Sequence, residues 1–170
     1  MLRSGQLNST VGPVTREFER EFAEYYGVDH VVASGSGTSA IHLAVAAVDP
    51  EPGDEIITTG LSDAGTVLPI LAQNAVPVFA DVDPASGNLD VDAVAARITD
   101  RTKAIIVVHL FGQPAPVAQL RALADPLGIV VIEDCAQALP DDGGARCRAG
   151  RHGGPYRLLQ SPAVQAHHRR

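Results

Sequence analysis

Several short runs of this sequence are apolar at nearly every position, and this feature constrains the fold more than any other. Residues 104–110 and 128–132 show no alternation of apolar and polar side chains, as is typical of strands covered on both faces. Segments with apolar residues at spacings of three and four, such as residues 91–98 and 115–123, alternate with these runs. The sequence therefore predicts an α/β fold in three layers, with a mostly parallel sheet and helices on both faces.

The same alternation starts near the beginning of the chain. An amphipathic helix is predicted over residues 13–26, where Gly27 ends it, and a buried strand over residues 31–33. The remaining predicted elements are a helix over 40–47, a strand over 55–59, a helix over 65–73 and a strand over 76–80. The periodicity ends after Pro140, and we divide the chain into an N-terminal portion, residues 1–145, and an aperiodic tail, residues 146–170.

Composition excludes several classes of function. The formal charge of −7 is unfavourable for binding nucleic acid, and no apolar run approaches the ~20 residues needed to span a membrane. The start of the chain does not resemble a secretion signal, so we expect a cytoplasmic protein. The two cysteines, Cys135 and Cys147, and the histidines lack the spacing of a metal site, which predicts thiols and no bound metal.

Residues 34–39 form a glycine-rich turn between the predicted strand 31–33 and the helix that follows. Such a turn exposes backbone N–H groups at the positive end of a helix, and we interpret Gly37, Thr38 and Ser39 as a phosphate site. The alternative is a turn used only for tight packing. A dinucleotide fingerprint also fits the glycines, but the next strand does not end on the acidic residue that would hold a ribose.

Polar residues follow two of the apolar runs. Glu133 and Asp134 come directly after residues 128–132, where ligand sites of open α/β folds lie. A carboxylate at this position can hold a protonated heteroaromatic nitrogen, although this segment by itself favours the alternative that Asp134 caps a turn or pairs with an arginine. His109 follows residues 104–108, where it either orients a substrate or binds a neighbouring backbone group.

In this order, the motifs resemble the DegT/DnrJ/StrS sugar aminotransferases, a family of fold-type-I pyridoxal phosphate enzymes. The resemblance runs from about Leu2 to about Arg148, so it implies an incomplete large domain of such a transferase. Its markers are residues 4–7, 12–13, 18–19, 22–23, 36–44, 52–55, 77–79, 81–84, 99–104, 108–113 and 133–138.

The resemblance also implies roles for individual residues. Residues matching Gly37, Thr38 and Ser39 hold the cofactor phosphate, the residue matching Asp134 pairs with the pyridine nitrogen, and the one matching Gln137 lies near the phenolic oxygen. Asp63 aligns with a position that usually carries an aromatic ring stacked on the cofactor. The implied cofactor is pyridoxal 5'-phosphate. The implied activity moves an amino group from glutamate or glutamine to a keto sugar or cyclitol, in a homodimer.

One departure concerns the catalytic lysine to which relatives attach the cofactor, which follows the segment matching residues 133–138. Lys103 is the only lysine of this chain, so no catalytic residue is assigned and we expect the chain alone to be inactive. A frameshift after about residue 148 is our hypothesis for the tail. The alternatives are a sugar dehydratase of the same family, with His167 or His168 in place of the lysine, and a non-catalytic pseudoenzyme.

Overall fold

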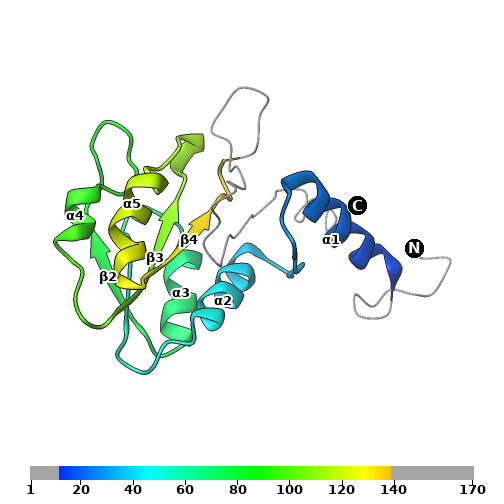
Figure 1. Cartoon of the computed structure of the whole chain (residues 1–170), viewed down its shortest axis with the longest axis horizontal. Coiled ribbons are helices and arrows are strands. Elements are labelled where there is room, and N and C mark those ends of the chain that lie inside the picture. The colour runs from blue at the N-terminus through cyan, green and yellow to red at the C-terminus, as the bar shows by residue number, and fades with distance from the viewer. Residues whose placement is uncertain (1–11, 139–170) are drawn as a thin grey trace. The chain divides into compact units, whose positions relative to one another are not determined.

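The computed structural model describes residues 12–138 (Figure 1). These residues belong to two compact units, residues 12–34 and residues 35–138, and each unit is described by itself. The aperiodic tail, which contains Cys147, His167 and His168, lies outside the described residues, as does the marker at residues 4–7. No helix among residues 12–138 has both the length and the apolar character that a membrane span requires.

The first unit contains helix α1 (Pro13–Tyr26), as the sequence predicted. Pro13 lies in its first turn, and Gly27 ends it in the left-handed conformation, with a φ of 64°. The predicted strand over residues 31–33 is wrong, because these residues pair with none of the described strands and Val32 is 72% exposed. A strand is held by hydrogen bonds to a neighbour, which a local apolar pattern does not supply.

The second unit alternates helices and strands. Its elements are α2 (Gly37–Val48), β1 (Glu55–Thr59), α3 (Ala64–Ala72), β2 (Val76–Ala80), α4 (Val91–Ala95), β3 (Thr102–Val108), a 3-10 turn η2 (Leu110–Gly112), α5 (Val117–Ala124), a second 3-10 turn η3 (Asp125–Leu127) and β4 (Val130–Asp134). The four strands form one sheet in the order β2-β1-β3-β4, and every neighbouring pair is parallel. The predicted α/β fold with a parallel sheet is therefore confirmed.

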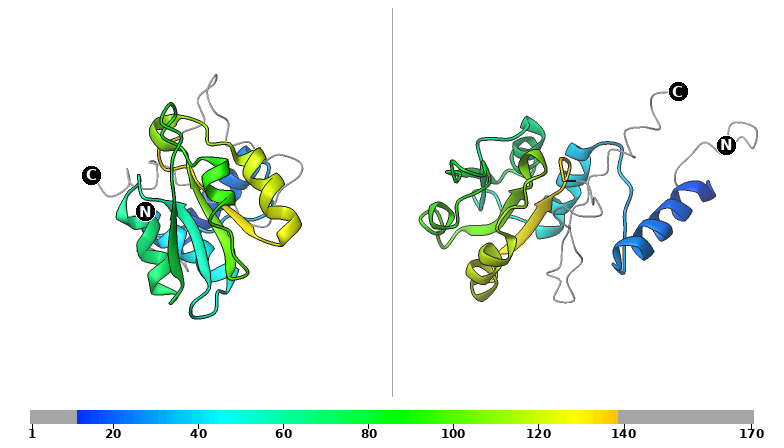
Figure 2. Two further views of the ribbon diagram at one scale, coloured as in Figure 1. Left: turned by 90° about the vertical axis from the view of Figure 1, so that its left-hand side faces the viewer. Right: turned by 90° about the horizontal axis from the view of Figure 1, so that it is seen from above.

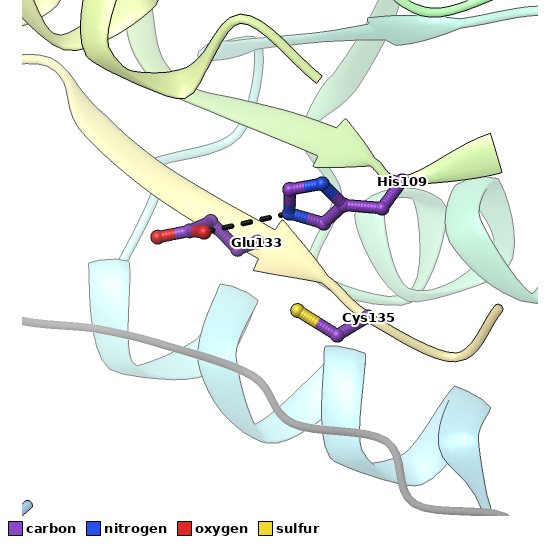
Figure 3. A group of neighbouring side chains, drawn as sticks. All are labelled: His109, Glu133 and Cys135. Atoms are coloured by element: carbon purple, nitrogen blue, oxygen red, sulfur yellow. Dashed lines mark ion pairs between the residues drawn. The ribbon is translucent and has the colours of Figure 1, made fainter. Parts of the chain in front are cut away.

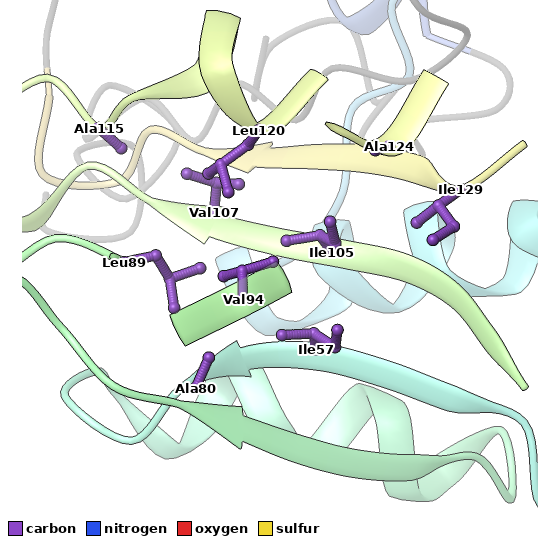
Figure 4. Packing of buried hydrophobic residues seen from close by; sticks show 10 residues of the cluster. All are labelled: Ile57, Ala80, Leu89, Val94, Ile105, Val107, Ala115, Leu120, Ala124 and Ile129. Carbon is purple, nitrogen blue, oxygen red and sulfur yellow. The ribbon is translucent and has the colours of Figure 1, made fainter. Parts of the chain in front are cut away.

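Helices cover both faces of this sheet (Figures 1 and 2). Ile105 and Val107 of β3 pack with residues of α4 and α5 on one face, as Figure 4 shows. Ala104 and Ile106 of the same strand pack with residues of α2 and α3 on the other face. Because successive side chains of a strand point to opposite faces, a centrally placed strand must be apolar throughout, which explains the pattern of residues 104–108.

Because the four strands are parallel, their carboxyl ends lie along one side of the sheet, the carboxyl edge, and their amino ends lie along the opposite side, the amino edge. At the carboxyl edge β1 ends at Thr59, β3 at Val108 and β4 at Asp134. Helix α3 follows β1 after a short connection, so the N-terminus of α3 begins near this edge. Strands and helix termini thus bring together residues that lie far apart in the sequence.

Candidate functional site

The N-terminus of α2 is the first part of the candidate site. Ser36 caps this helix, and its Oγ accepts a hydrogen bond from the Ser39 N–H at 3.1 Å. The Ala40 N–H bonds to the Ser36 carbonyl, so the first-turn N–H groups of Gly37 and Thr38 are the ones available to an anion. The positive end of the helix dipole lies at the same place, which is the arrangement expected of a phosphate site.

The N-terminus of α3 lies against the first turn of α2. Asp63 caps α3, because its Oδ1 accepts a hydrogen bond from the Gly65 N–H at 2.7 Å. A Cβ atom placed on Gly65 would come within 2.6 Å of the Thr38 Oγ1, closer than real Cβ atoms approach. Glycine at position 65 therefore allows the two helix ends to meet, and the sequence analysis did not single it out.

Asp134 is a buried acidic residue of this edge, at the end of β4. The carboxyl is 5% exposed, and its Oδ1 accepts a hydrogen bond from the Ala136 N–H at 3.1 Å. Burial raises the pKa of Asp134, and nearby Asp63 raises it further, whereas the Ala136 N–H and His109 act in the opposite direction. Asp134 has no ion pair with arginine or lysine among residues 12–138, so no such side chain offsets its charge.

The loop that follows β3 is fixed to the end of β4 through Gln137. The Oε1 of Gln137 accepts a hydrogen bond from the Phe111 N–H at 2.8 Å. Asn88, 1% exposed, holds the same loop from another side, because its Oδ1 accepts from the Leu110 N–H and its Nδ2 donates to the Gln113 carbonyl. A single asparagine in a loop gives no sequence signal for such a role, and our sequence analysis missed it.

His109, Glu133 and Cys135 form a buried group behind this edge (Figure 3). One ligand atom of each lies within 4.8 Å of the others, which is the composition of a metal site. The Nδ1 of His109 accepts a hydrogen bond from the Ala115 N–H at 3.1 Å, so the proton of the neutral ring is on Nε2, which faces Glu133 Oε2 at 3.4 Å. A protonated Nε2 is not a metal ligand. Cys135 is disulfide-bonded, which corrects the predicted thiol.

Lys103 lies at the other edge of the sheet. It is the second residue of β3, and its Nζ is 3.9 Å from Asp54 Oδ2. At a rise of ~3.3 Å per residue, about 17 Å of strand separates Lys103 from Val108 at the carboxyl edge. The amine of Lys103 is therefore remote from Asp134.

The residues of the carboxyl edge fit pyridoxal phosphate. The N-terminus of α2 suits the phosphate group, because a dianion is stabilised by free N–H groups and the helix dipole. The buried Asp134 suits the pyridine nitrogen, because a carboxylate without a cationic partner favours a protonated nitrogen beside it. When bound, this cofactor supplies an electron sink for reactions at an amine carbon.

Comparisons with known proteins agree with the resemblance found in the sequence. The model of the DegT/DnrJ/EryC1/StrS aminotransferase family matches residues 1–153. The L-glutamine:2-deoxy-scyllo-inosose aminotransferase of Streptomyces kanamyceticus is 48% identical over 144 residues, covering 81% of this chain and 34% of that protein.

Two solved structures are similar to this chain. The aminotransferase from Psychrobacter cryohalolentis is 43% identical with a TM-score of 0.78, covering 81% of this chain and 35% of that one. NtdA from Bacillus subtilis with bound cofactor PMP is 34% identical with a TM-score of 0.78, covering 82% of this chain and 32% of that one. The chain thus spans about a third of the length of the curated relatives it matches.

Proposed function

The chain belongs to the DegT/DnrJ/EryC1/StrS aminotransferase family, and from this membership we propose that it forms part of the cofactor-holding domain of a pyridoxal phosphate-dependent aminotransferase. In this proposal the whole enzyme is a homodimer that moves an amino group from glutamine or glutamate to a keto sugar or cyclitol. The name of the relative from Streptomyces kanamyceticus, which specifies L-glutamine and 2-deoxy-scyllo-inosose, supports this choice of donor and acceptor.

One observation carries the proposal: the buried Asp134 carboxylate has no arginine or lysine partner among the described residues, and it lies at the edge where ligands bind in open α/β sheets. We propose that Asp134 holds the pyridine nitrogen of the cofactor in its protonated form. The N–H groups of Gly37 and Thr38, with the hydroxyls of Thr38 and Ser39, hold the phosphate. Gln137 contributes a polar group near the phenolic oxygen, and Asp63, whose charge raises the pKa of Asp134, contacts the cofactor as well.

The position of Lys103 determines how these residues hold the cofactor. Lys103 is the only lysine in the 170 residues and lies at the amino edge, where it faces Asp54. We therefore infer that these residues bind the cofactor without a covalent bond and do not transaminate by themselves. The amine that moves a proton during transamination in relatives has no counterpart at the carboxyl edge of residues 35–138.

The experiment is a titration of the 170-residue chain with pyridoxamine 5'-phosphate, followed by isothermal calorimetry. This form of the cofactor has an amine in place of the aldehyde and does not react with Lys103. We expect saturable binding that Asp134→Asn weakens, because the neutral amide no longer stabilises a protonated ring nitrogen. Lys103→Arg is the matched control, and it should bind as the parent chain does.

A second measurement tests the absence of transamination. The chain is incubated with pyridoxal phosphate and L-glutamine, and absorbance follows conversion of the cofactor to its amine form. We expect no conversion above the rate without protein. The absence of pyridoxamine phosphate binding, or equal binding by the Asp134→Asn variant, would contradict the proposed site, and protein-dependent conversion would contradict the inferred inactivity.

A further inference from the structure

Phe111 has the most exposed large apolar side chain of residues 12–138, with 79% of its surface accessible. It lies in η2, directly after the carboxyl end of β3. Its backbone has a φ of 53° and a ψ of 26°, the left-handed region that bulky side chains rarely adopt. Phe111 thus exposes its aromatic ring to solvent at the carboxyl edge, and its backbone conformation is strained.

Three hydrogen bonds keep this backbone in place. The Phe111 N–H donates to Gln137 Oε1 at 2.8 Å, and the Leu110 N–H donates to Asn88 Oδ1 at 3.0 Å. The Asn88 side chain also donates to the Gln113 carbonyl at 3.2 Å. A strained conformation persists only where its surroundings determine it this strongly, and such conformations concentrate at ligand sites.

We propose that Phe111 is a ligand-contacting residue whose ring packs against the ring of the ligand held at Asp134. This inference rests on the proposed function, which places a pyridine ring at that carboxylate. Gln137 follows Asp134 by three residues and accepts a hydrogen bond from the Phe111 N–H, so Phe111 is attached to the segment that begins at Asp134. An aromatic pair adds a favourable interaction to the area it buries, and Phe111 has no contact with another aromatic ring among residues 12–138.

The proposal predicts that removing the Phe111 side chain weakens ligand binding without lowering the stability of the fold. Phe111 adds little to the fold, because its ring is exposed and its left-handed backbone is unfavourable for a bulky side chain but not for glycine. Phe111→Gly removes the strain and also removes the ring. A residue with only a structural role would lose stability and affinity together.

The test uses the full 170-residue chain and two probes. Pyridoxamine phosphate has both a ring and a phosphate group, whereas inorganic phosphate has no ring. Phe111→Ala and Phe111→Gly should each bind pyridoxamine phosphate about fivefold more weakly, as expected for the loss of one aromatic contact. Their affinity for inorganic phosphate should equal that of the parent, and Phe111→Gly should melt at or above the parent temperature. Leu127→Ala, a control exposed at a site before β4, should change neither affinity.

The outcomes separate this inference from the proposed function. If the parent does not bind pyridoxamine phosphate, both fail together. If the parent binds and Asp134→Asn weakens binding while the Phe111 variants bind like the parent, only the inference fails. An equal loss for inorganic phosphate would also overturn it, because the ring would then not be the group that is contacted. A lower melting temperature for Phe111→Gly would show that the ring supports the fold instead.

Discussion

Replacing Gly65 with alanine perturbs the contact between the first turns of α2 and α3. The added Cβ atom would lie 2.6 Å from Thr38 Oγ1 and 2.9 Å from Asp63 Oδ1. Neither neighbour moves without consequence, because Thr38 lies in the first turn of α2, and Asp63 caps α3 by accepting a hydrogen bond from the Gly65 N–H on its Oδ1. The substitution therefore forces apart the two helix ends that form the candidate phosphate site.

The expected cost follows from three contributions. Overpacking of this kind costs about 1–3 kcal/mol, and loss of the Asp63 cap adds about 1 kcal/mol. Alanine is better than glycine inside a helix by up to about 1 kcal/mol, which offsets part of the loss. We expect Gly65→Ala to lower the free energy of unfolding by about 1–3 kcal/mol. Its affinity for inorganic phosphate should also fall, because Thr38 is displaced.

Urea unfolding of the 170-residue chain measures the stability, and calorimetric titration measures the phosphate affinity. Gly60→Ala is the matched control, because a Cβ atom there meets only Phe79 Cδ1, at an ordinary 3.9 Å. A Gly65→Ala variant with the parent's urea midpoint would refute the reasoning. So would a Gly60→Ala variant that loses as much stability.

Three further predictions use the same unfolding assay. Asn88→Ala should lose about 2–4 kcal/mol of stability, because it leaves the Leu110 N–H and the Gln113 carbonyl without their partner, and an unchanged urea midpoint would contradict this. Glu55→Gln should destabilise the chain at pH 7 but much less at pH 3. The Thr99 hydroxyl and Arg101 lower the pKa of Glu55, so the stability that its charge contributes is lost as the pH falls through that lowered pKa. An equal loss of stability at both pH values would contradict this prediction. Asp134→Asn should melt at a higher temperature than the parent at pH 7. Burial raises the pKa of Asp134, so the folded state loses stability as the pH rises through that pKa, and the neutral amide avoids this loss. A variant that melts at a lower temperature than the parent would contradict the cost assigned to the buried Asp134 charge.

The fold was largely predictable from local pattern. Residues 104–108 are apolar on both faces because β3 lies between two strands and two helical layers, and this burial leaves a direct trace in the sequence. The apolar residues 31–33 leave the same trace without forming a strand, because pairing depends on a neighbour elsewhere in the chain. A local sequence pattern therefore predicts which residues are apolar enough to be buried more reliably than it predicts which residues contact one another.

The candidate site shows the same division. Gly37, Thr38, Ser39 and Asp134 could be predicted as site residues because glycine-rich turns and strand ends have recognisable positions in α/β sequences. Gly65 and Asn88 were missed because their importance arises from contacts with distant residues. Gly65 contacts Thr38, 27 positions earlier in the sequence, and Asn88 contacts Leu110, 22 positions later. The tautomer of His109 depends in the same way on the backbone of Ala115, which the residue type alone does not reveal.

The two edges of the sheet differ in how their charges are compensated, and this difference is the strongest physical argument for where the chemistry lies. At the amino edge Glu55 Oε1 lies 2.6 Å from Arg101, and Asp54 faces Lys103, so each carboxylate has a cation of the chain itself. At the carboxyl edge Asp134 and Asp63 have no arginine or lysine ion pair among the described residues. Asp134 is buried, and a buried carboxylate without a cationic partner is unfavourable. In the proposed site a cationic ring at Asp134 would remove this cost, so the same feature that weakens the fold would favour the ligand.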